Sequence, residues 1–247
     1  MLQNFISYLP ETEYSVESFK AILDPFSTEP PDKLVTKASH LLQEKLTLID
    51  HNFGLDTNKK SRPIGKMFGV LVVKDTEDKL GYLSAFSGKL NGGNHYEGFV
   101  PPVYDGLQEG GFLNKGMTQL SIIVNQVRAI QEENNPNKIQ ELESLKLQRK
   151  NHSQKLQQKL FESYHFLNSR KESKSLIEIF ADRQPQGGSG ECAAPKLLQY
   201  AFANNLTPIS IAEFWWGISP KSQQRIHKEF YPACEEKCRR ILGWMLG

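Results

Sequence analysis

The sequence has no apolar run that approaches the roughly 20 residues needed to span a membrane. Its first residues, Met1 to Phe5, lack the basic region followed by an apolar run that marks a secretion signal. Cysteine is scarce, with 3 residues in 247, and an odd number of cysteines does not suit a disulfide framework. These absences predict a cytoplasmic protein whose cysteines are thiols or metal ligands.

An excess of charge of one sign is also missing. Lys and Arg total 30 against 28 Asp and Glu, so the net charge is +2 and any basic surface for nucleic acid must be local. The hydrophobic share of 38% and the charged share of 23% are typical of folded proteins and exclude wholesale disorder. A chain of this length can bury one large core or two small ones.

The first part of the chain predicts helices followed by a β-hairpin. Val16 to Leu23 favours a short helix, and Lys33 to Asp50 keeps the three-to-four apolar spacing of a longer one. Met67 to Val73 is a continuous apolar run, as expected of a strand covered on both faces. Leu80 to Phe86 resumes after a polar turn and completes the hairpin. Gly88 to Gly116 is rich in Gly, Asn and Pro and predicts a long functional or mobile loop.

The middle of the chain predicts two helices that fold back on each other. Apolar positions from Leu120 to Ile130 mark one helix, and those from Ile139 to Leu167 mark a longer one. The breaker Asn134-Asn135-Pro136-Asn137 lies between them. We therefore expect an antiparallel helical hairpin over residues 118–172 that projects into solvent or toward a partner, with a homodimer through this hairpin as one outcome.

The last third predicts a return to α/β structure. Leu176 to Phe180 and Ile209 to Trp216 are strand-like, while Pro195 to Asn204 and Pro232 to Leu246 favour helices. The resulting expectation is an N-terminal helical segment (1–50) and one α/β domain (51–117 with 173–247). Residues 118–172 are then an insertion into that domain.

The three cysteines fall at predicted helix starts. Cys192 follows a Gly-rich turn, and Cys234 and Cys238 lie at the start of the last helix. Helix N-termini stabilise thiolates, because unpaired N–H groups and the helix dipole favour negative charge. Three thiolates from two helices can bind zinc and leave a fourth position for water. Simple packing is an equally open interpretation, since small cysteines are common core residues.

The cysteine segments resemble the zinc deaminase superfamily. The matching stretches are Gly190-Glu191-Cys192-Ala193-Ala194 and Pro232-Ala233-Cys234-Glu235-Glu236-Lys237-Cys238. The resemblance implies a deaminase-like mixed sheet with flanking helices and a zinc site. It does not imply deamination, because Ala194 stands where deaminases hold the Glu that moves the proton of the bound water. The second motif also has one extra residue on each side of its first cysteine.

A second resemblance covers about 60 residues, from Gly187 to Leu246. The segments Gly-Gly-Ser-Gly-Glu-Cys-Ala-Ala-Pro-Lys, Ala-Glu-Phe-Trp-Trp-Gly, Ser-Pro-Lys-Ser and Phe-Tyr-Pro-Ala-Cys-Glu-Glu-Lys-Cys are similar to the N-terminal extension of some RluA-type pseudouridine synthases. That family converts uridine to pseudouridine in ribosomal or transfer RNA without a metal or organic cofactor. Its catalytic aspartate lies in an Arg-Leu-Asp motif of the isomerase domain, which this sequence lacks; Leu48-Ile49-Asp50 has no preceding Arg.

The resemblance implies an accessory domain, not catalytic by itself, that works with a C-terminal synthase domain on RNA. Together with the apolar C-terminal end, it predicts a chain cut before its catalytic domain or a natural stand-alone relative. The alternative is a zinc-dependent hydrolase of deaminase type, or an inactive relative of one.

Two basic groups are candidates for RNA contact. One is an acid-free stretch with Lys146, Arg149, Lys150, Lys155 and Lys159, which predicts a stripe along one helix that tracks phosphates. The other surrounds the cysteine helix and is interrupted by Glu229, Glu235 and Glu236; it comprises Lys221, Arg225, His227, Lys228, Lys237, Arg239 and Arg240. The competing interpretation of either group is a solvated charged face.

Two further features have alternative interpretations. Trp215, Trp216, Phe230 and Tyr231 can stack on bases, but beside an apolar strand they favour a place in the core. The glycine-rich turn at 187–190 suits an anion at a helix N-terminus, and a tight turn explains it equally well.

Overall fold

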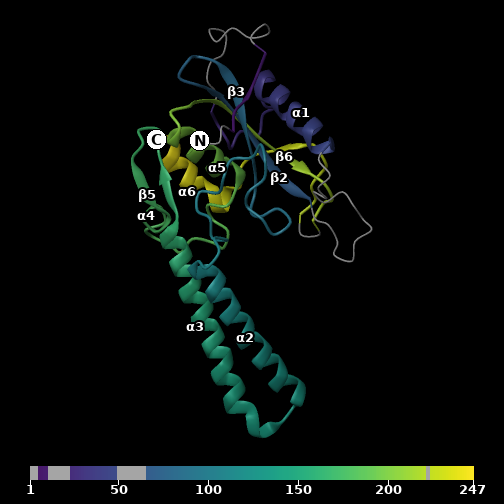
Figure 1. Ribbon diagram of the computed structural model, residues 1–247, viewed down its shortest axis with the longest axis vertical. Coiled ribbons are helices and arrows are strands. Elements are labelled where there is room, and N and C mark those ends of the chain that lie inside the picture. Colours follow the sequence, from purple (N-terminus) through teal and green to yellow (C-terminus); the bar gives the residue numbers. More distant parts are fainter. Residues whose placement is uncertain (1–4, 11–22, 49–64, 221–222) are drawn as a thin grey trace.

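The computed structural model describes residues 5–10, 23–48, 65–220 and 223–247. Five strands form one sheet in the order β1-β3-β2-β6-β7 (Figure 1). They are β1 (Ser7–Tyr8), β2 (Lys66–Lys74), β3 (Leu80–Phe86), β6 (Thr207–Trp216) and β7 (Phe230–Tyr231). Every strand pairing recorded in this sheet is antiparallel. The predicted α/β class is confirmed, and the described sheet is antiparallel where a mixed one was expected.

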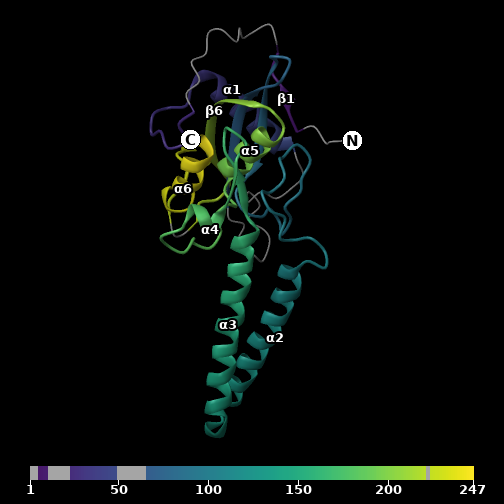
Figure 2. The same cartoon turned by 90° about the vertical axis from the view of Figure 1, so that its left-hand side faces the viewer.

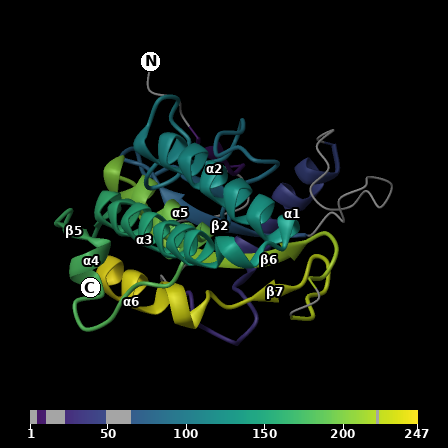
Figure 3. The same cartoon turned by 90° about the horizontal axis from the view of Figure 1, so that it is seen from below.

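The central strand β2 is buried on both faces, which explains its unbroken apolar sequence. Val70 and Val72 pack with α1 (Lys33–Leu48), and Leu71 and Val73 pack with α5 (Ala193–Ala203), because side chains alternate along a strand. Together with α6 (Glu235–Leu246), α5 covers the face opposite α1 (Figures 1 and 3). The sheet therefore separates two apolar layers.

Several predicted elements of this α/β body agree closely with the structure. The expected helix from Lys33 is α1, and Asp32 begins it by accepting hydrogen bonds from the N–H groups of Leu34 and Val35. The expected hairpin corresponds to β2 and β3. The last two helices are α5 and α6. The short helix expected at Val16 to Leu23 falls almost wholly outside the described residues.

The helices α2 (Phe112–Glu133) and α3 (Ile139–Ser163) lie side by side and extend away from the sheet (Figures 1 and 2). A single 3-10 turn, η3 (Pro136–Lys138), joins them. Gly116 lies against α3, where an added Cβ would come within 2.4 Å of a methyl carbon of Leu156. His152 Nε2 contacts the Gly116 carbonyl at 2.9 Å. This glycine therefore permits the close approach of the two helices.

The strand expected over residues 176–180 is wrong, because this segment forms the short helix α4 (Leu176–Ile179). Ser175 Oγ accepts from the Glu178 N–H, and the Glu178 carboxylate accepts from the Ser175 N–H, which is a capping box. The second long helix also ends earlier than expected. A two-stranded ladder of β4 (His165–Leu167) and β5 (Ser173–Ser175) follows it.

The segment between β3 and α2 is held by one carboxylate. Asp105 Oδ1 accepts from Asn94 Nδ2 and from the Leu107 N–H, each at 2.9 Å, and its Oδ2 contacts His95 Nε2 at 2.9 Å. The expected loop is also shorter than Gly88 to Gly116, since α2 begins at Phe112.

Within the described ranges, none of the helices has the length and apolar character needed to cross a bilayer.

Candidate functional site

The starts of α5 and α6 line a common pocket of about 330 Å³, which we call the α5–α6 pocket. Cys192 and Cys234 are the residues that begin the two helices, and both line it. The remaining lining residues are Lys66, Met67, Ser87, Gly88, Gly188, Glu191, Glu213, Arg225, Pro232 and Lys237. The pocket thus gathers charged and thiol side chains from β2, β6, α6 and three connecting segments.

A glycine on β2 allows α5 to approach the sheet at this point. Gly69 pairs with Glu213 on β6, and an added Cβ would lie 2.8 Å from the Ala193 Cβ and 3.0 Å from a Leu197 methyl. Because no side chain intervenes, the first turn of α5 packs directly over the strand. The N–H of Ala194 then donates to Glu213 Oε1 at 3.0 Å. A carboxyl group from the sheet therefore binds the first turn of α5.

Glu213 is 7% exposed and has a strongly altered acidity. Burial raises the pKa of its carboxyl group from 4.5 to about 7, against the opposing effects of the Ala194 N–H and the Arg225 charge. A carboxyl group with such a pKa exchanges protons near neutral pH, which is a property of many functional sites. This carboxyl group accepts a hydrogen bond from the N–H of Ala194, two residues after Cys192.

Two lysines lie beside this pocket. Lys196 is 3% exposed, and its Nζ donates to the carbonyls of Phe86 and Gly88 at 2.8 and 2.9 Å. Burial lowers the pKa of Lys196 to about 8, although the negative charge of Glu191 opposes this. Burial also lowers the pKa of Lys66, again opposed by Glu191. Through its hydrogen bonds to Phe86 and Gly88, Lys196 links the end of β3 to α5.

The structure tests whether the three cysteines fit a zinc ion. All three are free thiols, with Cys192 half-buried, Cys234 exposed and Cys238 buried. The pKa of the Cys238 thiol is raised, first by its hydrogen bond to Cys192 and then by burial. In the part of the chain that the structure describes, no group of three or more His, Cys, Asp or Glu side chains is arranged to hold a metal. The arrangement pairs Cys192 with Cys238, and the described residues do not bring three metal-binding side chains together.

All five cations of the predicted basic stripe lie on α3. At about 100° per residue, Lys150 lies about 100° and Lys155 about 240° from Arg149, so their spacing distributes these cations over more than one face of the helix. Lys146 pairs with Glu143 at 2.7 Å, and Lys159 Nζ lies 4.7 Å from the centre of the Phe112 ring. Arg149, Lys150 and Lys155 are exposed, and no ion pair with a described residue is recorded for them.

The two arginines of α6 are held by carboxylates. Arg239 pairs with Glu235 and lies over the ring of Phe26. Arg240 Nη2 donates to Asp182 Oδ2 at 2.8 Å. Their charges are partly neutralised within the protein, so they are weaker candidates for phosphate contact than the cations of α3. Lys221, from the same predicted basic group, lies outside the described residues.

A groove of about 660 Å³ runs along the base of α3. Lys155, Lys159 and the amide side chains of Gln154, Gln157, Gln158 and Gln184 line it, with Phe161, Glu162 and Pro185. Amides and lysines offer hydrogen-bond donors to phosphate and sugar oxygens. The groove therefore extends the polar surface of α3 toward the α/β body.

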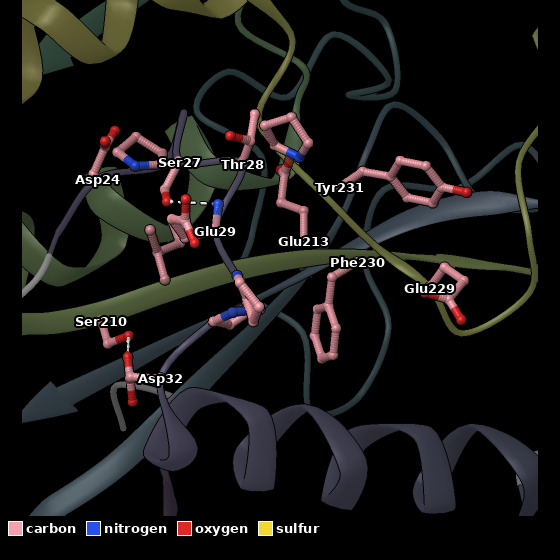
Figure 4. A pocket seen from close by; sticks show the side chains of 16 residues that line it. Asp24, Ser27, Thr28, Glu29, Asp32, Ser210, Glu213, Glu229, Phe230 and Tyr231 are labelled. Carbon is pink, nitrogen blue, oxygen red and sulfur yellow. Dashed lines mark hydrogen bonds between the residues drawn. The ribbon is translucent and has the colours of Figure 1, made fainter.

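The opposite side of Glu213 borders an acid-lined pocket of about 640 Å³ (Figure 4). Asp24, Glu29, Asp32 and Glu229 line it with Glu213, whereas no Lys or Arg does. Asp32 also accepts a hydrogen bond from the Ser210 hydroxyl, which ties the N-terminal segment to β6. Phosphate and other anions are repelled from such a surface.

Trp215 and Trp216 are core residues, as the sequence favoured. Trp215 is 9% and Trp216 0% exposed, so neither offers a face to a base. Phe230 and Tyr231 are half-buried. Sequence reasoning missed Glu213, Lys196 and Lys66. A lone Glu inside the apolar run of β6 was the one signal that could have indicated Glu213.

Comparison of the chain with protein-family models, with curated proteins and with solved structures finds no match.

Proposed function

We propose that this chain is the RNA-engaging, N-terminal accessory domain of an RluA-type pseudouridine synthase acting on ribosomal or transfer RNA. The resemblance between the segment 187–246 and that family supports the proposal. The partners are then RNA and a C-terminal isomerase domain, and the isomerisation itself needs no cofactor. The scarcity of cysteine and the three free thiols support a reducing, cytoplasmic compartment.

One observation carries the RNA-engaging part of this proposal. The exposed cations Arg149, Lys150 and Lys155 lie on a helix pair that extends away from the α/β body, and Lys155 also lines the amide-lined groove. No acidic residue occurs between Lys146 and Lys159. A projecting, locally positive helix can reach the backbone of a folded RNA without bringing the acid-lined pocket close to phosphate.

Filter-binding titrations with transfer RNA and ribosomal RNA fragments test this function. We expect micromolar or tighter binding that weakens steeply as salt rises, because phosphate contacts release counterions. Heparin is the control ligand, because it is a polyanion that lacks the folded shape of RNA. Binding of folded RNA that exceeds heparin binding at equal salt supports the proposal, whereas no salt-sensitive RNA binding at micromolar protein contradicts it.

A zinc-dependent hydrolase of deaminase type is the second candidate. Its support is the pair of cysteines that begin α5 and α6 at one pocket, with Cys238 beside Cys192. This second proposal includes two structural expectations. The α/β domain has a deaminase-like fold, and residues 118–172 form a helical hairpin inserted into it. Cys234 lines the same pocket as Cys192, and zinc bound by all three thiols would require Cys234 to join the pair formed by Cys192 and Cys238.

Metal analysis of the purified chain tests the second candidate. One zinc per chain that is lost in Cys192→Ser would establish the site, and turnover of cytidine or adenosine would then be needed for the hydrolase. Protein free of metal after purification with added zinc would remove this candidate.

A homodimer through α2 and α3 is the remaining partner proposal. Met117, Ile122 and Leu147 on these helices are about half exposed or more, with fractions of 49%, 54% and 58%. Solution mass measured by light scattering distinguishes a dimer from a monomer. Ile122→Gln is expected to shift a dimer toward monomer, and a monomer in the unchanged protein contradicts the proposal.

A further inference from the structure

Three cations from distant parts of the chain meet in the α5–α6 pocket. Lys66 comes from β2, Arg225 from the segment before β7, and Lys237 from the first turn of α6. Each is half-buried, so its charge is screened less than that of a fully exposed side chain. Lys66 is close to Glu191, and the Arg225 guanidinium lies 4.1 Å from the centre of the Tyr231 ring. For Lys237, no described carboxylate forms a recorded ion pair.

The starts of two helices add to this positive character. α5 and α6 have 11 and 12 residues, and the residues that begin them, Cys192 and Cys234, both line the pocket. Neither cysteine side chain caps its helix with a hydrogen bond. The positive ends of both helix dipoles therefore point toward the same space, which favours an anion there.

A buried acceptor lies in the same pocket. Glu213 is more than nine-tenths buried, and Ala194 is the one described residue that donates a hydrogen bond to its carboxyl group, at Oε1. Its Oε2 makes no recorded hydrogen bond with a described residue and is not fully buried, so it remains accessible to solvent. An accessible carboxyl oxygen at a pocket wall can accept a hydrogen bond from a hydroxyl or N–H group of a ligand.

We propose that the α5–α6 pocket binds a phosphorylated nucleoside, with its phosphate among Lys66, Arg225 and Lys237 and a ribose hydroxyl or base N–H donating to Glu213. The volume of about 330 Å³ lies at the small end of ligand pockets and suits a single nucleotide. A nucleoside monophosphate fits better than inorganic phosphate, because its ribose hydroxyls and base N–H groups can donate to Glu213 while its phosphate stays among the three cations.

The inference rests on the proposed function in one respect, since RNA is the expected source of the nucleotide. The alternative source with the same chemistry is a free nucleoside monophosphate. An RNA with a 5′-phosphate presents the group at a chain end, where a single nucleotide can enter a small pocket. An RNA with a 5′-hydroxyl presents only diesters.

Calorimetric titration of the whole chain, with EDTA present, measures binding of uridine and adenosine 5′-monophosphates, the two nucleosides and inorganic phosphate. We expect the monophosphates to bind about tenfold or more tightly than the nucleosides or phosphate, since a charged hydrogen bond contributes about that factor. Lys237→Ala and, separately, Lys66→Ala are expected to weaken monophosphate binding about tenfold. Lys115→Ala, an exposed lysine on α2, is the matched control and should leave it unchanged.

The outcomes separate this inference from the proposed function. Monophosphate binding that both pocket variants weaken supports the pocket, and tighter binding of 5′-phosphorylated than 5′-hydroxyl RNA identifies RNA as its source. Monophosphate binding without any RNA binding identifies the free nucleotide and contradicts the proposed function. Salt-sensitive RNA binding with no monophosphate binding overturns the pocket and leaves the proposed function standing. If both pocket variants are folded and bind the monophosphate as tightly as the unchanged chain does, the pocket inference is also overturned.

Discussion

At the residue scale, Glu213 connects the sheet to the candidate site. Its carboxyl group binds the first turn of α5 and lies on the wall between the α5–α6 pocket and the acid-lined pocket. The sequence shows only a Glu within an apolar strand, whereas its acidity depends on burial beneath a helix that follows Cys192. Such long-range neighbours cannot be read from local patterns. Lys196 illustrates the same limit, because its Nζ binds the carbonyl of Phe86, 110 residues earlier.

Glu213→Gln should change how stability depends on pH. Burial raises the pKa of the folded carboxyl group from 4.5 to about 7, so the folded protein holds more protons than the unfolded chain between these values. The free energy of unfolding therefore falls as pH rises from 4.5 to 7, by about 3 kcal/mol for this group, and is level above 7. Glutamine keeps an acceptor for Ala194 but does not ionise.

Urea unfolding at several pH values between 4.5 and 8 measures this effect. The variant is expected to lose most of the decline that the unchanged protein shows in that window. Equal declines in both proteins would show that Glu213 ionises normally in the folded state.

At the element scale, apolar patterns predicted the α/β class and several elements from the sequence. β2 was recognisable because a strand covered on both faces is apolar at successive positions. The segment Leu176–Ile179 was misassigned because a short apolar run suits a strand or a helical turn equally. The spacing of Ser175 and Glu178 was the signal that distinguishes them. The starts of α5 and α6 were predictable, but their meeting at one pocket was not.

The packing of α2 on α3 depends on Gly116. Gly116→Ala improves helix propensity, but its methyl group would lie 2.4 Å from a Leu156 methyl, so we expect a net loss of about 1 kcal/mol. Gly243→Ala in α6 is the matched control, because nothing lies within 4 Å of its added methyl. That change should stabilise the protein by about 0.5–1 kcal/mol.

Thermal and urea unfolding of the two alanine variants give the comparison. The predicted order of stability is Gly243→Ala, then the unchanged protein, then Gly116→Ala. If Gly116→Ala stabilised the protein as much as Gly243→Ala does, α2 and α3 would not be packed closely at this residue.

At the scale of the whole molecule, positive and negative surfaces are separated. Exposed cations lie on the projecting α3, whereas Asp24, Glu29 and Glu229 gather at the acid-lined pocket beside β6 and β7 (Figure 4). A net charge of +2 conceals this separation, which depends on the fold. The sequence identified the basic residues of α3 and their spacing along the helix, but not the contact of Lys159 with the ring of Phe112. Under the proposed function, RNA is expected to contact α3 from more than one side.

The dependence of RNA affinity on salt tests the central claim most directly. A variant with Arg149, Lys150 and Lys155 changed to glutamine should lower the slope of log affinity against log salt by about two to three relative to the unchanged chain. A control with Lys33, Lys89 and Lys171 changed to glutamine loses the same charge from exposed sites of the α/β body and should keep the original slope. Equal slopes for all three proteins would contradict RNA engagement through α3.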